Sequence, residues 1–414
     1  MAGRGGGLRV GIVGGSIAGC SLAVELTRAG HEVVVYEREL GELVGRGAGI
    51  ATPTPTMQSM LERDLVDHDL PRFALSRHVF NGRDDAGNSN VALTLPLDMV
   101  VFNWGDLWRS LRRRVPDSVY RAGSAVVGVL GRESEAPRLR LADGTESAFD
   151  LVLFADGYRS IGRAALFPEA EPRYLGYVLW RGVLEEGALD DAAPLEDALF
   201  RMSYKGIPGT AVCYFVPGRG GGTATGERWV NWACYIALPK DELPGFLVDR
   251  DGRQRHGSLP PGAMRLGEEA RLRALMRTHL PDYFGEIIGA SADTFAQPIF
   301  MAEIPAYRRG RIGLAGDAGA LMPPFTGSGV FKAMNDAVHL ADALSTTGSV
   351  DVALARWSER ETESARRLAA LARQMDDAFV WRAPDFGTMA ETDTAAWWKA
   401  AVTFPDDFRY VKGG

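Results

Sequence analysis

Cysteine is scarce in this sequence, and the few residues that it has lie far apart. The chain contains Cys20, Cys213 and Cys234. An odd number at such wide spacings indicates neither a disulfide framework nor a cysteine-based zinc site. We therefore expect reduced thiols, no bound metal and a cytoplasmic location.

Long apolar runs and an excess of positive charge are missing as well. No stretch approaches the roughly 20 apolar residues that a membrane-spanning helix needs, and residues 1–7 read as a lead-in to a strand rather than as a signal peptide. The formal net charge of −7 argues against nucleic acid as a partner. Of the 414 residues, 46% are hydrophobic and 24% are charged, which indicates a soluble protein of two or more domains.

A glycine-rich turn between two apolar strands is the first feature with chemical meaning. Residues 8–37 predict a strand, a turn that starts at Gly14, a helix and a second strand that ends in Glu37. In this βαβ pattern a dinucleotide pyrophosphate lies on the helix N-terminus and the acid binds a ribose. Glu37 follows Gly14 by 23 positions, near the usual spacing of roughly 20. In the usual G-x-G-x-x-G pattern of this turn, Ser16 replaces the second glycine and offers a hydroxyl group to the phosphates. Glycine-rich turns of this kind also occur where they only allow close packing of the chain.

Two further turns place an acid directly after an apolar strand. Asp156 and Asp317 each follow such a strand, and each has a glycine beside it. A carboxylate at the end of a parallel strand is well placed to hold a polar ligand group. Gly327 and Gly329 then open a long helix, whose free N–H groups would stabilise negative charge.

The composition changes between residues 174 and 238, which are rich in aromatic and β-branched side chains. Glycine and proline separate four apolar stretches there, which predicts an antiparallel sheet inserted between nucleotide-binding segments. The sheet would cover a flat organic substrate, or its aromatic residues would only form a core. Alternation places Asn231 and Tyr235 on one face and Trp232 on the other, but it does not tell which face meets the cofactor.

Taken together, the three turns resemble the hallmarks of the class A flavoprotein aromatic hydroxylases, which are single-component FAD monooxygenases. The middle motif has the form D-G-x-x-S-x-x-R, from Asp156 to Arg163. The late motif has the form R-x-x-L-A-G-D-A, from Arg311 to Ala318, and two prolines follow it. The resemblance covers about residues 8–345.

Within this family the likeness is strongest to the 2,6-dihydroxypyridine 3-monooxygenase-like members. The features that support it are the Gly-Gly-Ser turn, Trp104, the G-Y-x-x-W-R-G stretch at 176–182 and the R-x-x-N-W stretch at 228–232. Neighbouring members hydroxylate other rings, so the substrate stays open.

The resemblance implies an α/β fold with three parts. These are a Rossmann-type FAD-binding domain at residues 1–75, 98–172 and 276–346, an inserted antiparallel β-sheet substrate domain at 76–97 and 173–275, and a C-terminal helical region at 347–414.

The resemblance also implies FAD as the cofactor and NADPH or NADH as a transient co-substrate, for which the chain has no second dinucleotide fingerprint. Arg46 would contact a phosphate or a flavin carbonyl, or it would only be a solvent-exposed side chain. Asp156 and Arg163 would act near the pyrophosphate, or they would only form an internal ion pair. The cofactor-binding residues that the motifs indicate are Gly14, Ser16, Ile17, Ala18, Glu37, Arg38, Arg46, Arg109, Val126, Asp156, Gly316, Asp317, Pro324, Gly327, Ser328 and Gly329.

The reaction implied is hydroxylation of an electron-rich aromatic ring through a flavin C4a-hydroperoxide, with O2 and NAD(P)H consumed. A hydroxypyridine or phenol, free or as part of a secondary metabolite, would be the substrate. Ala320 and Phe331 stand where relatives have polar residues, which favours a bulkier or greasier substrate.

Catalytic candidates are harder to identify. Pro324 lies near the flavin edge in relatives, His256 sits in the loop after the aromatic sheet, and Tyr204 belongs to the sheet itself. The base that deprotonates the substrate stays open, because Tyr177, Tyr214 and Tyr235 compete for that role.

Two other functions use the same motifs. A flavoprotein dehydrogenase or oxidase would make no hydroperoxide, and a non-catalytic carrier on the same fold, like the GDP-dissociation inhibitors, would do no chemistry. A flavin-dependent halogenase would need a W-x-W-x-I-P motif, which the chain lacks. The expected partners are a small aromatic substrate and O2, without nucleic acid or membrane, and the sequence leaves homo-oligomerisation open.

Overall fold

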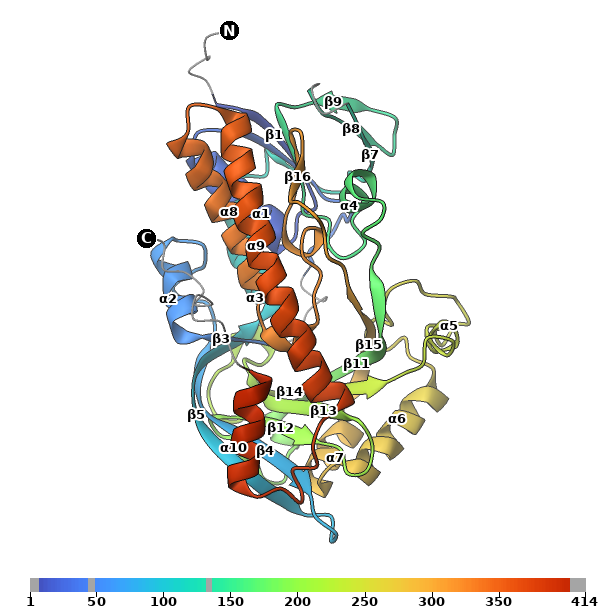
Figure 1. Cartoon of the computed structure of the whole chain (residues 1–414). Coiled ribbons are helices and arrows are strands. Elements are labelled where there is room, and N and C mark those ends of the chain that lie inside the picture. The colour runs from blue at the N-terminus through green and yellow to red at the C-terminus, as the bar shows by residue number, and fades with distance from the viewer. Residues whose placement is uncertain (1–6, 44–48, 132–135, 403–414) are drawn as a thin grey trace.

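The computed structural model describes residues 7–43, 49–131 and 136–402, and Arg46 lies outside them. Figure 1 shows two regions built around two large sheets, one above the other. The long helix α9 (Val350–Asp376) runs beside both regions.

The upper region contains a six-stranded sheet in the order β16-β17-β10-β1-β2-β6, which is parallel except for β16. Its apolar strands are covered on both faces, as parallel strands require. The strands are β1 (Arg9–Val13), β2 (Glu32–Tyr36), β6 (Tyr120–Arg121), β10 (Leu151–Phe154), β16 (Arg308–Arg309) and β17 (Ile312–Leu314).

Two helices, α1 (Ile17–Arg28) and α8 (Gly329–Thr346), share a hydrophobic core with this sheet. Each begins at a glycine-containing turn that follows a strand of the sheet. A small three-stranded sheet lies beside them in the upper region (Figure 1). Its strands are β7 (Val126–Leu130), β8 (Arg138–Leu141) and β9 (Glu146–Ala148).

The lower region contains an eight-stranded sheet in the order β15-β11-β14-β13-β12-β4-β5-β3. It differs from the predicted antiparallel sheet in one pair, because β12 runs parallel to β4. The strands are β3 (Gly49–Pro53), β4 (Phe73–Arg83), β5 (Ser89–Asn103), β11 (Arg173–Glu185), β12 (Ala198–Ser203), β13 (Gly209–Val216), β14 (Trp229–Ala237) and β15 (Ala292–Met301).

This sheet recruits strands from outside the residue ranges 76–97 and 173–275 that the sequence analysis assigned to it. β3 pairs with β5, and β15 pairs with β11. Helices α6 (Leu266–His279) and α7 (Asp282–Ala290) share a core with one face of the sheet. Pairing between distant segments leaves no local sequence pattern, so the membership of β3 and β15 in this sheet could not be predicted from the sequence.

The remaining helices connect or cover the two sheets. They are α2 (Thr54–Glu62), α3 (Trp104–Arg113), α4 (Ile161–Leu166), α5 (Leu243–Phe246) and α10 (Glu391–Ala401), with a π-helix η7 (Asp377–Trp381) and short 3-10 turns η2 (Glu186–Ala188), η3 (Ala193–Leu195), η4 (Arg219–Gly221), η5 (Gly316–Ala318) and η6 (Pro324–Thr326).

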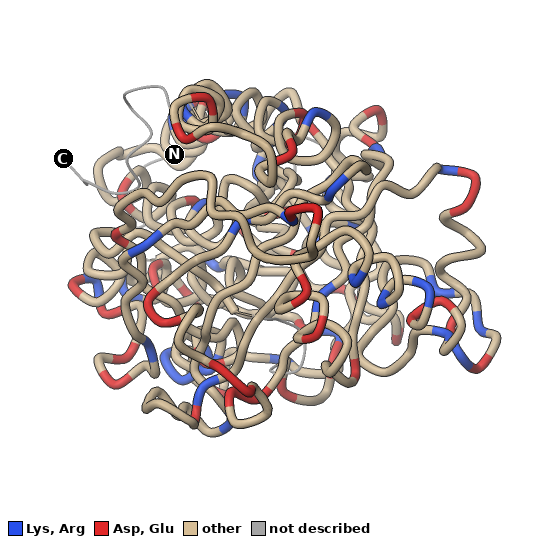
Figure 2. The backbone as a smooth tube through the Cα atoms, turned by 90° about the horizontal axis from the view of Figure 1, so that it is seen from below, with Lys and Arg blue, Asp and Glu red and all other residues tan. Residues whose placement is uncertain are grey.

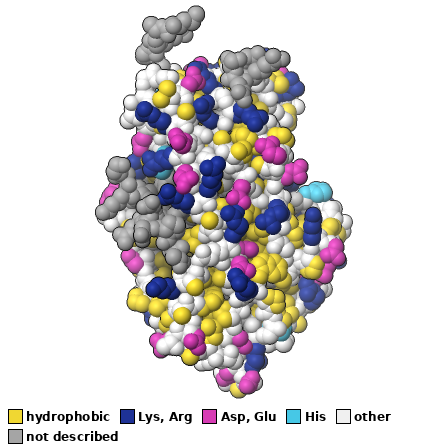
Figure 3. Space-filling view, in the orientation of Figure 1, with side chains coloured by type: hydrophobic (Ala, Val, Ile, Leu, Met, Phe, Trp, Pro, Cys, Tyr) yellow, Lys and Arg dark blue, Asp and Glu magenta, His cyan; other side chains and the backbone are white. Residues whose placement is uncertain are grey.

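Charged residues of both signs are interspersed along the chain when the molecule is seen from below (Figure 2). On the face of Figure 1, Lys and Arg side chains follow the course of α9, and apolar atoms gather over the lower sheet (Figure 3). Among the described residues, no helix combines the length and the apolar character that crossing a membrane requires.

Candidate active site

The three sequence motifs meet where the parallel strands of the upper sheet end. The turn at Gly14 follows β1, Asp156 follows β10 and Gly316 follows β17. A Cβ atom on Gly14 would lie 2.4 Å from the carbonyl oxygen of Ala155, and one on Gly316 would lie 2.9 Å from the Cβ of Ala18. Because the turns pass this closely, glycine is needed at both positions. Ligands of open α/β sheets bind at this end of the strands.

The first turn holds an acid in a fixed orientation. The Glu37 carboxylate accepts the N–H of Gly15 at 2.8 Å and the N–H of Glu39 at 2.9 Å. Glu37 is 6% exposed. Ser16 is the N-cap of α1 but makes no capping bond with its hydroxyl, and the first N–H groups of α1 have no partner within the helix. The turn therefore offers a carboxylate for ribose hydroxyls beside N–H and O–H donors for a pyrophosphate.

The middle motif links to the late motif through Arg163. This side chain donates from Nη1 to the carbonyl oxygens of Asp317 and Ala318, at 3.0 and 3.3 Å, and it also contacts the carbonyl of Tyr158. Asp156 accepts the N–H of Ile161 at 2.8 Å, while its Oδ1 is buried without a partner among the described residues. Burial raises the pKa of Asp156. Arg163 thus bridges two loops rather than forming the internal ion pair that was its alternative.

Asp317, the penultimate residue of the late motif, lies at an open position. Its side chain is exposed to solvent, yet the surrounding protein raises its pKa to about 6, a rise that Arg163 partly opposes. A carboxylate in such a recess is stabilised by any ligand that supplies hydroxyl donors. The geometry therefore fits the polyol chain of FAD at Asp317.

Replacing Asp317 with asparagine is expected to weaken FAD binding roughly thirtyfold, because a hydrogen bond to a charged group contributes about 2 kcal/mol. The stability of the apoprotein should instead increase on this substitution at neutral pH. Since folding raises the pKa of Asp317 to about 6, the wild-type apoprotein loses stability as the pH rises through that value.

The Asp317→Asn apoprotein should therefore unfold at a higher temperature than wild type at about pH 7.5, by no more than about 1 kcal/mol after solvent screening. The two should melt alike near pH 4. Fluorescence titration with FAD and thermal unfolding of the apoproteins measure both effects. Equal FAD affinity in the two proteins would remove Asp317 from the site.

The segment after the late motif presents backbone groups. Pro324, Gly327 and Gly329 are exposed, and Gly327 takes a left-handed conformation with φ 63° that favours glycine. Ser328 is buried, and its hydroxyl lies 2.6 Å from that of Thr326. The start of the 18-residue helix α8 therefore has open N–H groups that suit the electron-rich edge of a flavin.

Phe325, within this segment, meets one face of the eight-stranded sheet. Its ring centroid lies 4.3 Å from that of Tyr235 and 6.3 Å from that of Tyr177. On the same face, Asn231 accepts the N–H of Gly49 at 3.2 Å. The opposite face packs on α6 and α7. The face that carries Asn231 and Tyr235 is therefore the one that faces the cofactor segment.

A row of four residues crosses this face, and we call it the substrate row. Arg201 pairs with Val212, Val212 with Ala233, and Ala233 with Arg181. Two small side chains thus lie between two arginines. Neither arginine is among the site residues predicted from the sequence, although a charged residue inside an apolar strand was the available signal.

Several donors at and beside the substrate row are buried without a partner among the described residues. They are Nε of Arg181, Nε and Nη1 of Arg201, and Nδ2 of Asn231. Burial lowers the pKa of Arg201 to about 10, so it stays charged at neutral pH. Burial likewise raises the pKa of Tyr214 to about 12, so this phenol stays protonated. The face therefore offers donors and positive charge to a ligand rather than a base.

The structure moves Tyr204 away from the cofactor segment, whereas a catalytic role of His256, whose pocket also includes Ser160 and Arg163 of the middle motif, stays a prediction. Tyr204 lies on the opposite face, in the core shared with α6 and α7, and its hydroxyl donates to the carbonyl of Thr210 at 2.9 Å. His256 is exposed and lines a pocket of about 440 Å³ with Tyr158 and Phe300. Alternation and loop position cannot tell which side of a sheet a residue occupies.

The other predicted cofactor residues have local roles in the structure. Arg38 is exposed and lies 3.6 Å from Glu39, and Arg109 pairs with Asp106 at 2.7 Å. Val126 starts β7 at a register shift, close to the first motif because Ser124 donates to the carbonyl of Glu37 at 2.8 Å. Their contacts with FAD stay predictions.

Three family models match overlapping parts of the chain. A model of the FAD dependent oxidoreductases matches residues 9–193, a model described as FAD binding domain-like matches 174–300, and an FAD binding domain model matches 268–370. The matched segments contain the turns at Gly14 and Asp317. They agree with the fit of FAD to the donors and carboxylates at the strand ends.

The chain is also similar to named proteins over nearly its full length. It is 26% identical to 2,6-dihydroxypyridine 3-monooxygenase of Paenarthrobacter nicotinovorans, over 86% of this chain and 87% of the relative. It is 29% identical to aurachin C monooxygenase/isomerase of Stigmatella aurantiaca, over 91% and 90%. The solved structure of 2,6-dihydroxypyridine-3-hydroxylase from Arthrobacter nicotinovorans superposes with a TM-score of 0.83, at 23% identity and 98% coverage of both chains. The family models thus place FAD-binding oxidoreductase domains over most of the chain, and the named relatives are consistent with the class A aromatic hydroxylase family.

Proposed function

We propose that this protein is an FAD-dependent monooxygenase that hydroxylates an electron-rich aromatic ring and consumes NAD(P)H and O2. The observation that carries the proposal is the substrate row, where Arg181 and Arg201 flank Ala233 and Val212 opposite the Phe325 segment. The relatives named above are monooxygenases by their printed names. FAD supplies the redox chemistry, because it takes electrons from NAD(P)H and activates O2.

The chain's own residues bind and orient the ring. Ala233 and Val212 place only small apolar side chains between the two arginines, and the unpaired donors of Arg181, Arg201 and Asn231 favour a ring that carries acceptor oxygens. A phenolate or a hydroxypyridine anion meets this requirement. The two guanidinium groups would lower the pKa of a ring hydroxyl by stabilising its anion, which makes the ring richer in electrons.

Aromatic side chains exclude water from this face. The ring of Phe325 packs edge-on against Phe379 at 5.2 Å, and the ring of Phe379 stacks on Trp398 at 6.0 Å. A dry surface strengthens the electrostatic effect of the arginines and protects reactive species from hydrolysis. Ala320 and Phe331 are buried in the hydrophobic core of the upper region, so the bulkier substrate that they favoured stays a prediction.

The test is a panel of hydroxypyridines and phenols, with and without apolar substituents, given to the purified FAD-loaded protein. We expect a substrate to stimulate NADH or NADPH oxidation and to yield a product one oxygen atom heavier, with the label from 18O2. A product without added oxygen would identify a dehydrogenase or oxidase instead. Failure to bind FAD would identify a non-catalytic carrier. Either outcome overturns the proposal.

A further inference from the structure

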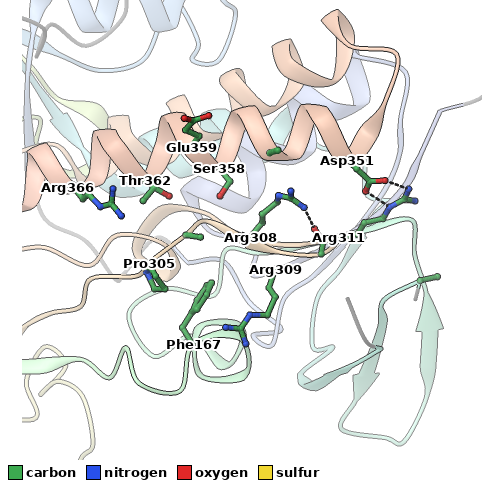
Figure 4. Close-up of a pocket in the computed structure, with 14 residues that line it drawn as sticks. Phe167, Pro305, Arg308, Arg309, Arg311, Asp351, Ser358, Glu359, Thr362 and Arg366 are labelled. Carbon is green, nitrogen blue, oxygen red and sulfur yellow. Dashed lines mark hydrogen bonds and ion pairs between the residues drawn. The ribbon is translucent and has the colours of Figure 1, made fainter. Parts of the chain in front are cut away.

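A second pocket lies away from the motif turns, between the β16–β17 hairpin and α9 (Figure 4). Its volume is about 1120 Å³. Apolar atoms of Phe167, Pro305 and Ala306 form part of its wall. The charged residues that line it are Arg308, Arg309, Arg311, Arg366, Asp351 and Glu359.

Positive charge outnumbers negative charge among the residues that line this pocket, since it has four arginines and two acids. Arg311 donates to both carboxylate oxygens of Asp351, at 3.0 and 3.1 Å, so these two charges neutralise each other. Arg308 donates from Nη1 to the carbonyl of Gly310 at 3.0 Å, a neutral group that leaves its charge in place. Arg366 is exposed and makes no ion pair with another described residue. In Figure 4 the remaining acid, Glu359, points away from Arg308.

Two hydroxyl groups face the same space. Ser358, Thr362 and Arg366 lie four residues apart, so they share one face of α9. Figure 4 shows Ser358 and Thr362 on the side of α9 that faces Arg308. Thr362 is 7% exposed, and its hydroxyl oxygen is buried without a partner among the described residues. Ser358 Oγ accepts the N–H of Tyr307 at 3.0 Å, which leaves its proton free for another acceptor.

We propose that this pocket binds a phosphorylated small molecule through its phosphate group. Guanidinium groups bind phosphate with paired hydrogen bonds, and hydroxyl donors complete its shell of acceptor oxygens. Arg308, Arg366 and Thr362 supply these groups from two elements. The guanidinium of Arg309 lies 5.0 Å above the ring of Phe167, and together with Pro305 this surface suits the organic part of the ligand.

This site is distinct from the FAD site. Arg311 precedes β17 and Asp317 follows it, so the two sites lie at opposite ends of this three-residue strand, which is about 10 Å long. The proposal therefore does not depend on the hydroxylase reaction. Phosphate binding can be measured whether or not a ring substrate is found.

The experiment measures binding of inorganic phosphate and of AMP to the FAD-loaded protein by isothermal titration calorimetry. We expect both to bind, and we expect the Arg308→Gln/Arg366→Gln double variant to bind at least about tenfold more weakly, because two charge-assisted contacts are lost. Thr362→Val keeps the side-chain volume and should weaken binding several-fold. Arg356→Gln is the matched control, since Arg356 is exposed on α9 and does not line the pocket.

Tighter binding of AMP than of inorganic phosphate would mean that the apolar wall contacts the organic part of the ligand. Equal binding would mean that the pocket recognises the phosphate group alone. Both results support the site if the double variant loses them. No binding of either ligand to the wild type would overturn it, as would equal binding in the wild type and the double variant. Visible absorbance of bound FAD in every variant verifies that the fold is intact. An oligoglutamate peptide is tested in the same way. If it binds the wild type as tightly as phosphate does and does not bind the double variant, the proposal of a phosphate ligand is wrong and the pocket binds an acidic protein segment.

Discussion

Replacing Lys332 with methionine is expected to lower the free energy of unfolding by about 3–5 kcal/mol, because it removes the ammonium group that two buried carboxylates share and leaves Glu361 with His339 alone. Lys332 is 2% exposed, contacts Asp336 and lies 2.9 Å from Glu361 on α9. Burial lowers the pKa of Lys332, but Asp336 and Glu361 outweigh it and hold the pKa well above its usual range. The ammonium group is therefore charged at every pH at which the protein is studied.

This buried group also supports the cofactor site. Asp336 accepts the N–H of Gly316 at 2.7 Å, and the side chain of Trp357 donates to its backbone carbonyl at 2.9 Å. The Lys332→Met protein should therefore bind FAD more weakly as well. Its stability loss should be larger at pH 8 than at pH 5.5, because Asp336, whose pKa burial already holds well above its usual range, takes up a proton at the lower pH and opposes folding as an unpaired charge only at the higher pH.

Urea unfolding at a fixed FAD concentration, carried out at pH 5.5 and at pH 8, measures the loss of stability of the Lys332→Met protein together with its weaker FAD binding. Arg356→Met, at an exposed position on α9, is the matched control and should stay within about 0.5 kcal/mol of wild type. A loss below about 1 kcal/mol for Lys332→Met would mean that the carboxylates find other partners or become protonated without cost.

Replacing Arg201 with methionine is expected to reduce kcat/KM for an oxygen-bearing ring about a hundredfold, because hydrogen bonds from a charged donor contribute about 1.5–3 kcal/mol. The apoprotein should unfold at an equal or higher temperature. Arg201 is 8% exposed, and its Nε and Nη1 have no partner among the described residues. Burial lowers its pKa to about 10, so keeping it charged at neutral pH opposes folding.

Steady-state kinetics on the best ring from the panel and thermal unfolding of the apoprotein together test this change. Arg201→Lys should recover part of the activity, since it keeps the charge without the planar donors. Arg173→Met, at an exposed position on β11, should leave both quantities unchanged. A loss of stability together with unchanged kcat/KM would assign Arg201 a structural role, carried by its contact with the ring of Phe379 at 4.2 Å.

The cofactor half of the site could be predicted from the sequence because it depends on local chemistry. A glycine at a tight strand-to-helix turn and an acid after the next strand are visible within about 30 residues, and the motifs at Asp156 and Asp317 repeat that logic. The structure adds the contacts that join them, such as the bonds from Arg163 to the carbonyl of Asp317. Arg163 belonged to a motif, but its partner was 154 positions away.

The substrate half could not be predicted in the same way. Strand alternation separates Asn231 from Trp232 but is symmetric between the two faces. Only tertiary packing breaks that symmetry, because α6 and α7 cover one side and Phe325 meets the other. The same packing moves Tyr204 away from the ligand and brings Arg181 and Arg201 into one row.

The sequence by itself thus determined the fold class, the cofactor and the turns that hold it, since these follow from residues close together in the chain. The tertiary structure alone decided which sheet face meets the Phe325 segment, which cations lie on that face, and that Arg308 and Arg366 share a pocket. Those choices depend on contacts between segments tens to hundreds of residues apart, and no local pattern encodes such contacts.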